Sequence, residues 1–195
     1  DGAEYGIQLS YATESVPLGT AGSVKNAERG LRGEPFLVVS GDALTDIDLT
    51  ELLAFHHRTG AVVTVALARK PNVLEFGNVT TAEDGRVERF IEKPTWGQVV
   101  SDTVNTGIYV MAPEVLDLVP QDERSDWSVD ILPKLLAAGR PIYGYVTDAY
   151  WEDVGTIESY LAVQSDVLAG HVEAHIGGFE VAPGVWLGEG AVVDP

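Results

Sequence analysis

A chain of 195 residues, 45% of them hydrophobic, can bury the core of one domain with a small appendage, and it has no run of about 18 apolar residues that would span a membrane. Its formal net charge of −18 would repel a phosphate backbone, so no nucleic-acid partner is expected, although a divalent cation could bridge the protein to a small anionic substrate. The absence of cysteine excludes disulfides, thiolate catalysis and cysteine-type zinc sites, and it fits a cytoplasmic protein. The acidic start of the chain does not resemble a secretory signal.

The first third of the chain predicts strands and helices in alternation. Residues 7–11 alternate apolar and polar side chains, as a half-buried strand does. Residues 21–31 are compatible with a helix, and residues 36–39 form a continuous apolar run of the kind found in central parallel strands. A helix over 49–58 and a buried strand over 61–67 follow.

The middle of the chain has a more antiparallel character. Asp84 and Gly85 form a hairpin turn signal between strands around 78–80 and over 86–91. The next elements are a strand over 106–111, a helix that Ser128 caps and Gly139 ends, and a strand over 142–146. Strands and helices of these lengths, in this alternation, indicate an α/β domain with a mainly parallel, covered sheet.

The last part of the chain has a different sequence pattern. Thr156 is expected to cap a helix whose apolar positions lie on one face: Ile157, Tyr160, Leu161 and Leu168. From residue 181 onward, an aliphatic residue followed by a small or acidic one returns every six residues, which is how a hexapeptide β-helix begins. Only about two coils are present, whereas such repeats usually need at least about three. We therefore expect one domain over 1–170, and a linker with the first coils of a β-helix over 171–195.

Small residues before the first helix could approach a ligand. They are Leu18, Gly19, Thr20, Ala21 and Gly22. Their backbone amides, at a helix N-terminus, suit an anion or a ring acceptor, and an ordinary strand-to-helix turn is the alternative.

Two acidic residues follow predicted strands. Ser40, Gly41 and Asp42 end the strand over 36–39, and ligands of open α/β sheets bind outside the carboxyl ends of strands, so Asp42 is well placed to hold Mg²⁺. Asp153 lies between a strand and a helix start, where it could be a second metal ligand. The alternatives are a turn residue at position 42 and a capping charge at position 153.

Two further pairs carry groups that suit a sugar phosphate. Glu92 can hydrogen-bond sugar hydroxyls and Lys93 can neutralise a phosphate, although a surface ion pair would look the same. Asn105 and Thr106 place an amide and a hydroxyl ahead of a strand, where a turn is the alternative. Each signal is modest alone, and their joint order on an α/β chain argues against coincidence.

The histidines point to no site. They are His56, His57, His171 and His175, and none has a second metal ligand at a suitable spacing, so we assign them to surface or packing roles.

The order of these motifs resembles the sugar-1-phosphate nucleotidyltransferase family, and within it the mannose-1-phosphate guanylyltransferase branch. The resemblance covers about the first 170 residues, and the tail is similar to the left-handed β-helix that follows in many members. Residues 92–98 and 178–186 look like the long forms that carry a phosphomannomutase-like domain. The motifs that carry the resemblance are 18–22, 40–42, 76–77, 92–94, 105–109 and 151–155.

The resemblance implies a Rossmann-like nucleotidyltransferase fold with a mainly parallel mixed sheet that lacks its N-terminal strand, and it assigns each candidate a role. Asp42 and Asp153 would hold catalytic Mg²⁺, Glu92 would bind sugar hydroxyls, and Lys93 would bind the sugar phosphate. The segment 18–22 would contact the base through its backbone. The remaining substrate-binding residues would be Gly41, Gly77, Asn105 and Thr106.

The family also has a Gly-rich loop with a basic residue, which wraps the triphosphate and precedes these motifs. Residue 1 lies downstream of the usual place of this loop. We therefore expect the chain alone to have little or no activity, and the strand over 36–39 to become an exposed edge.

The implied reaction joins a nucleoside triphosphate to a sugar 1-phosphate and releases pyrophosphate. GTP and mannose 1-phosphate are favoured by resemblance, and thymidine or uridine nucleotides with glucose 1-phosphate stay open. We also expect a homo-oligomer. The competing hypotheses are a non-catalytic regulatory module that binds a nucleotide sugar and a scaffold that oligomerises through the β-helix. A hexapeptide-repeat acyltransferase is disfavoured, because so few coils cannot form its usual trimeric site.

Overall fold

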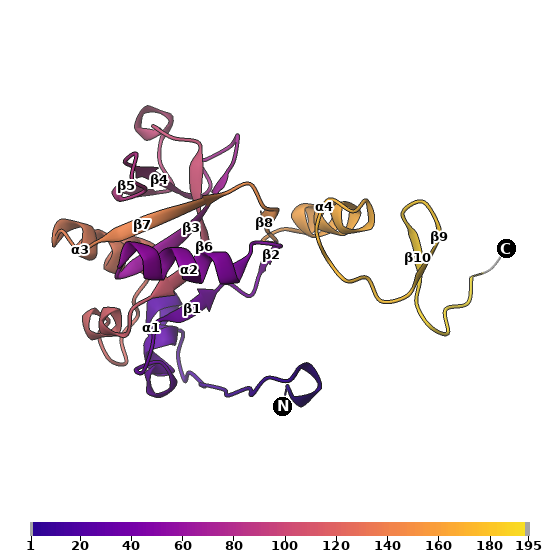
Figure 1. The fold of residues 1–195 in the computed structure, drawn as a ribbon, viewed down its shortest axis with the longest axis horizontal. Coiled ribbons are helices and arrows are strands. Elements are labelled where there is room, and N and C mark those ends of the chain that lie inside the picture. Colours follow the sequence, from indigo (N-terminus) through magenta and orange to yellow (C-terminus); the bar gives the residue numbers. More distant parts are fainter. Residues whose placement is uncertain (1, 194–195) are drawn as a thin grey trace.

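The computed structural model describes residues 2–193. Its body is a six-stranded sheet with the order β5-β4-β6-β3-β7, and β1 pairs with β6 beside this path (Figure 1). A separate pair of short strands, β2 with β8, lies next to α4. The strands are β1 Phe36–Val39, β2 Ala43–Thr45, β3 Val63–Arg69, β4 Gly77–Thr81, β5 Val87–Glu92, β6 Thr103–Met111, β7 Ile142–Thr147, β8 Trp151–Asp153, β9 Phe179–Ala182 and β10 Val185–Leu187.

Four α-helices accompany these strands: α1 Gly19–Asn26, α2 Leu49–Thr59, α3 Leu132–Ala137 and α4 Ile157–Leu168. Short 3-10 turns occupy Ala3–Tyr5, Glu28–Gly30, Trp96–Gln98 and Pro113–Leu118, and a π-helical turn, Trp127–Ile131, leads into α3. None of the helices in the described range is both long and apolar enough to cross a membrane.

The sheet is mixed, and the expectation of a mainly parallel sheet is wrong. Within residues 2–193 only β3 and β7 pair in parallel, whereas β6 runs antiparallel to β1, β3 and β4. The apolar run of β1 reports neither strand direction nor full burial, because Phe36 is buried whereas Leu37 and Val39 are 39% and 48% exposed. Among the described strands β1 pairs only with β6, so a continuous apolar run here belongs to an antiparallel strand with one unpaired side rather than to a central parallel strand.

Two apolar layers cover the sheet, as the sequence predicts. Val63 and Val65 of β3 pack into the cluster that contains the side chains of α3, whereas Ala66 and Ala68 pack into the cluster with Leu52 of α2. Alternate residues of one strand point to opposite faces, so β3 joins both layers. This rigid centre fixes where the strands end, and therefore where side chains beyond those ends can meet.

Two helix starts test the predicted caps. Thr156 caps α4 as expected, since its side chain accepts a hydrogen bond from the Ser159 amide. The helix expected to start at Ser128 is instead capped by Asp126, whose side chain accepts from the amides of Ser128 and Val129. Aspartate is as good an N-cap as serine, so residue type alone did not separate the two.

His56 has a packing role, as expected. Its imidazole is 3% exposed, and its Nδ1 lies 2.9 Å from Thr64 Oγ1. Burial lowers the pKa of His56, and the neighbouring His57 lowers it further.

The two ends of the chain differ most from expectation. Residues 7–11 form no strand and are exposed, and the predicted helix over 21–31 is divided into α1 and a 3-10 turn. Ile157, Tyr160 and Leu161 share the expected face of α4, yet they are 81%, 57% and 59% exposed. Amphipathic spacing predicts the element correctly but not whether a partner covers it.

Residues 171–193 form no coil of the expected β-helix. Strands β9 and β10 pair antiparallel as a hairpin, with a register shift between Val185 and Trp186, whereas β-helix coils stack in parallel. Residues 194 and 195, which complete the hexapeptide pattern, lie outside the described range.

Candidate functional site

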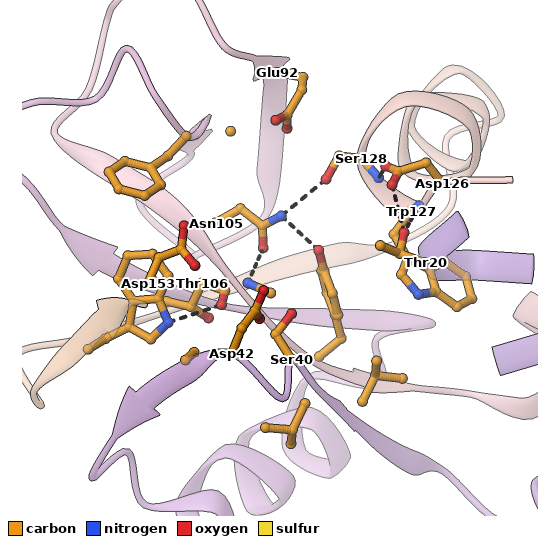
Figure 2. A pocket seen from close by; sticks show the side chains of 18 of the residues that line it. Thr20, Ser40, Asp42, Glu92, Asn105, Thr106, Asp126, Trp127, Ser128 and Asp153 are labelled. Atoms are coloured by element: carbon orange, nitrogen blue, oxygen red, sulfur yellow. Dashed lines mark hydrogen bonds between the residues drawn. The ribbon is translucent and has the colours of Figure 1, made fainter. Parts of the chain in front are cut away.

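An open cleft of about 490 Å³ lies where β1, β2, β6 and β8 meet the 92–93 and 126–128 segments (Figure 2). Eight of the predicted site residues line it: Thr20, Asp42, Gly77, Glu92, Lys93, Asn105, Thr106 and Asp153. The cleft therefore gathers side chains from segments that are more than 100 residues apart in the sequence.

Strand pairing brings the two aspartates together. Ala43 of β2 lies opposite Asp153 of β8, and the Val154 amide donates to the Asp42 carbonyl oxygen at 2.8 Å. Burial raises the pKa of Asp153, the negative charge of Asp42 raises it further, and Lys93 lowers it. Two carboxylates thus face one cleft and repel each other.

This arrangement fits a magnesium ion. Among residues 2–193, no group of three or more acidic or histidine side chains could enclose a metal by itself. Mg²⁺ usually takes only one or two protein carboxylates and completes its shell with water and substrate phosphates. An aspartate pair with unbalanced negative charge at the edge of an open cleft suits that mode of binding.

Glu92 lies across the cleft from Asp42 (Figure 2), and Lys93, the next residue, lies near enough to Asp153 to lower its pKa. Gly77 pairs with Glu92 across the β4–β5 hairpin, and a Cβ at Gly77 would lie 2.8 Å from Glu92 Oε2. Lost hydration in the cleft raises the pKa of Glu92, and the charge of Asp126 raises it further. Lys93 adopts a left-handed φ of 45°, and its amide donates to the Phe76 carbonyl oxygen at 3.2 Å.

Asn105 and Thr106 lie on β6 between these two sides. Asn105 Nδ2 donates to Tyr109 Oη at 2.7 Å and reaches Ser128 Oγ at 3.3 Å. Thr106 Oγ1 donates to the Ala66 carbonyl oxygen at 2.8 Å, so its hydroxyl is hydrogen-bonded to the backbone of the neighbouring strand β3. Burial raises the pKa of Tyr109 to about 12, which keeps its phenol neutral at ordinary pH.

The segment 18–22 is arranged differently from the expectation. Of its residues only Thr20 lines the cleft, whereas Leu18, Ala21 and Gly22 are buried. The amides of Ala21 and Gly22 both donate to the Ser125 carbonyl oxygen, at 2.9 and 3.2 Å. These two amides are therefore engaged by the protein itself. Gly41 is exposed and does not line the cleft either.

Several lining residues were missed by the sequence analysis. They include Ser40, Tyr109, Asp126, Trp127 and Ser128. Tyr109 follows Asn105 by four positions on β6. Asp126 is the N-cap of the turn before α3, so a correct prediction of this cap would have drawn attention to residues 126–128. The contact of the 126–128 segment with α1 has no local sequence signal.

The chain is similar to known proteins over most of its length. Residues 1–170 match the nucleotidyl transferase family model. The chain is 38% identical to mannose-1-phosphate guanylyltransferase of Mycobacterium tuberculosis, over 99% of this chain and 56% of that protein. It is 34% identical to UTP–glucose-1-phosphate uridylyltransferase of Synechocystis sp., over 96% of this chain and 52% of that protein. The chain thus spans about half the length of these two relatives.

Solved structures show the same fold. A putative glucose-1-phosphate thymidylyltransferase from Bacillus anthracis, in complex with a sucrose, superposes with a TM-score of 0.75 at 21% identity, over 90% of this chain and 70% of that one. HddC from Yersinia pseudotuberculosis, in complex with GMP-PN, gives a TM-score of 0.64 at 25% identity, over 76% and 62% of the two chains. With a matching family model over 170 residues and relatives at 34–38% identity, the chain belongs to the sugar-1-phosphate nucleotidyltransferase family.

Proposed function

We propose that the protein containing this chain transfers a nucleotidyl group from a nucleoside triphosphate to a sugar 1-phosphate. The observation that carries the proposal is the cleft itself, in which the Asp42 and Asp153 pair faces Lys93, Glu92 and Asn105. One side suits a metal-bound phosphate chain, and the other suits a hydroxyl-rich ring with a phosphate.

The reaction is an in-line displacement. A phosphate oxygen of the sugar 1-phosphate forms a bond to the α-phosphorus, the α–β anhydride bond breaks, and pyrophosphate leaves with the electron pair. Asp42 and Asp153 would hold Mg²⁺, which supplies neutralisation of the phosphate charges when it is bound. Lys93 binds the sugar phosphate. Glu92 accepts hydrogen bonds from the sugar hydroxyls, and Asn105 donates hydrogen bonds to them. The protein contributes position and charge, and no covalent enzyme intermediate is needed.

GTP and mannose 1-phosphate are the substrates that we propose first, because the M. tuberculosis relative with that name is 38% identical. UTP with glucose 1-phosphate is the second candidate, because the Synechocystis relative is 34% identical over a similar length. Thymidine nucleotides with glucose 1-phosphate also stay in the test. The homo-oligomer and the cytoplasmic location stay predictions.

The test is a pyrophosphate-release assay on the protein expressed from its complete reading frame. GTP, UTP and dTTP are each combined with mannose 1-phosphate and glucose 1-phosphate, with Mg²⁺ and with EDTA. We expect turnover with one pair, highest for GTP with mannose 1-phosphate, and none in EDTA. Binding of a nucleotide sugar without pyrophosphate release from any pair would instead support the regulatory module.

A further inference from the structure

The N-terminal end of α1 lies directly against the backbone of residues 123–127. The Ala21 and Gly22 amides donate to the Ser125 carbonyl oxygen, and the Ser125 amide donates back to the Leu18 carbonyl oxygen at 2.8 Å. Three main-chain hydrogen bonds therefore join two segments that are about a hundred residues apart in the sequence.

The glycines of this segment permit the close approach. A Cβ at Gly19 would lie 2.7 Å from the Ser125 carbonyl oxygen, and Gly19 also has a positive φ of 74°. A Cβ at Gly22 would lie 2.8 Å from the Glu123 carbonyl oxygen. Real Cβ atoms do not approach so closely, so side chains at either position would push the helix away from the 123–127 segment.

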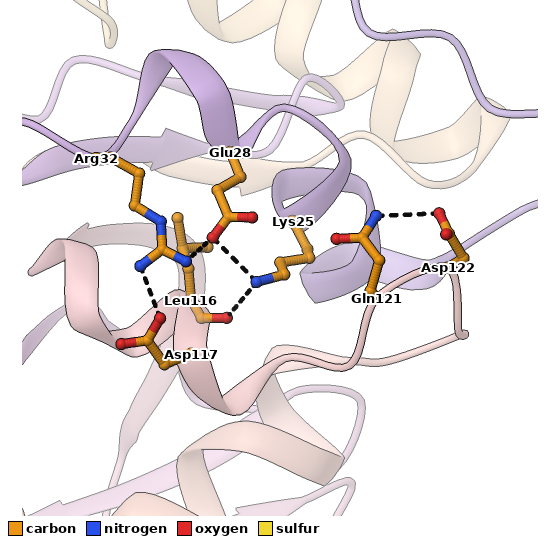
Figure 3. Close-up of polar contacts among 7 residues, drawn as sticks. All are labelled: Lys25, Glu28, Arg32, Leu116, Asp117, Gln121 and Asp122. Atoms are coloured by element: carbon orange, nitrogen blue, oxygen red, sulfur yellow. Dashed lines mark hydrogen bonds and ion pairs between the residues drawn. The ribbon is translucent and has the colours of Figure 1, made fainter.

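The C-terminal end of α1 and the turn after it contact residues 116 and 117, which precede the 123–127 segment (Figure 3). Lys25 Nζ donates to the Leu116 carbonyl oxygen and to Glu28 Oε1, both at 3.0 Å. Arg32, just beyond the helix, pairs with Asp117 at 2.6 Å and also with Glu28. Helix α1 is thus fixed at both ends, and loss of one side-chain contact at its N-terminus need not release it.

Thr20 is the residue of this segment that lines the cleft, and its hydroxyl is already engaged (Figure 2). Thr20 Oγ1 donates to Asp126 Oδ2 at 2.8 Å and accepts from the Trp127 amide at 3.0 Å. The other carboxylate oxygen of Asp126 accepts from the amides of Ser128 and Val129. The hydroxyl therefore ties α1 to the turn that presents Ser128.

Ser128 continues the network toward the sugar side of the cleft. Its Oγ lies 3.3 Å from Asn105 Nδ2, and Ser128 is near enough to Glu92 to lower the pKa of that carboxyl. Asp126 also faces Glu92 closely enough to act on its charge. A continuous set of hydrogen bonds thus runs from Thr20 through Asp126 and Ser128 to Asn105, one of the residues proposed to bind the sugar.

We propose that Thr20 is a positioning residue for sugar 1-phosphate: its hydroxyl holds Asp126, and through it Ser128, in the place where Ser128 orients Asn105. This inference rests on the proposed function. Thr20 belongs to the segment predicted to contact the base, yet the proposal gives it an effect on the binding of sugar 1-phosphate. If the Thr20 hydroxyl instead contacted the nucleotide directly, its removal would weaken binding of the nucleotide.

The first test is Thr20→Val, which removes the hydroxyl at nearly constant shape. The KM for sugar 1-phosphate should rise about three- to tenfold, as expected for one lost hydrogen bond, while the KM for the nucleotide and kcat change less than about twofold. Thr20→Ser keeps the hydroxyl and should restore the KM. Thr59→Val is the matched control, because the Thr59 hydroxyl bonds only within α2 and lies outside the cleft. A rise in the nucleotide KM alone, or no rise in either KM, overturns the proposal.

The second test is a double-mutant cycle with Ser128→Ala. If Thr20 acts through Ser128, the double variant should have a sugar 1-phosphate KM close to that of the weaker-binding single variant. Independent effects, which multiply, would mean that Thr20 does not act along this route.

Amide hydrogen exchange separates this inference from the proposed function. Thr20→Val should speed exchange at Trp127, whose amide loses its acceptor, and Thr20→Ser should not. Unchanged exchange in Thr20→Val means that the hydroxyl does not hold the turn, and the positioning role is then wrong even in an active enzyme. If the wild type shows no turnover with any substrate pair while the exchange changes as expected, the proposed function fails and the contact stands.

Discussion

The two sides of the cleft are built by different means. Asp42 and Asp153 are brought together by main-chain pairing of β2 with β8, and their side chains repel each other. Asn105, on the side of Glu92, is held by side-chain hydrogen bonds to Tyr109 and Ser128. The two aspartates are therefore placed by main-chain pairing, whereas the position of Asn105 depends on neighbouring side chains.

This difference predicts how each side responds to substitution. A conservative change at an aspartate removes charge without moving the backbone, so it should affect chemistry and leave stability intact. A change near Glu92 or Asn105 moves neighbouring groups, so it should affect binding of one substrate. The variants below test this contrast in the protein expressed from its complete reading frame.

The largest effect is expected at the aspartates. Asp42→Asn and Asp153→Asn should each lower kcat by about a hundredfold or more, because the charge that would hold Mg²⁺ against the phosphates is lost. The melting temperature should stay equal or rise, since the change relieves repulsion. Isothermal titration with Mg²⁺ and nucleotide sugar measures the metal affinity, and Asp148→Asn, at an exposed position outside the cleft, is the control. Undiminished metal affinity in both variants would remove the metal assignment.

A smaller and substrate-specific effect is expected at Lys93. Lys93→Ala removes a charged hydrogen bond, so the KM for sugar 1-phosphate should rise about ten- to a hundredfold and the KM for the nucleotide much less. Steady-state kinetics with each substrate varied in turn measures both values. Lys134→Ala, an exposed lysine of α3, controls for loss of one positive charge from the protein. Equal losses for both substrates would show that Lys93 has only a structural role.

The smallest effect is expected at Gly77. In Gly77→Ala the new methyl group would overlap Glu92 Oε2 and the Phe90 ring, so Glu92 must shift. We expect the sugar 1-phosphate KM to rise by about tenfold or less, since the carboxylate is displaced but not removed. Gly97→Ala is the control, because a Cβ there meets no atom within 4 Å. An unchanged KM together with an unchanged melting temperature would mean that Glu92 moves freely. Substrate binding on the Glu92 side of the cleft would then not depend on neighbouring side chains, contrary to the contrast drawn above.

The sequence predicted the features that depend on local chemistry. The Asp84–Gly85 turn joins β4 to β5, Thr156 caps α4, and Asp42 and Asp153 line one cleft, all as expected. Turn and cap signals act over a few residues, and the position of a carboxylate at or just beyond the end of a strand follows from how sheets present their ends.

Features that depend on which segments meet were not predicted. The pattern of β1 could not reveal that it pairs antiparallel with β6. Gly19 and Gly22 were interpreted as room for a ligand, yet the room is filled by the backbone of residues 123–125. The apolar face of α4 was correctly placed on one side of the helix, but a periodic pattern says nothing about whether that side is covered. In each case the missing information is a partner distant in sequence.

The backbone at Lys93 has a consequence for engineering. Lys93 and Asp122 are the non-glycine residues with positive φ among residues 2–193, and glycine or asparagine adopts such a conformation at lower cost. A directed-evolution experiment that selects only for thermostability should therefore favour replacement at both positions. At position 122 the exchange lies outside the cleft, whereas at position 93 it would remove the lysine proposed to bind the sugar phosphate. Residue 93 is thus a place where selection for heat resistance and selection for turnover should choose different amino acids.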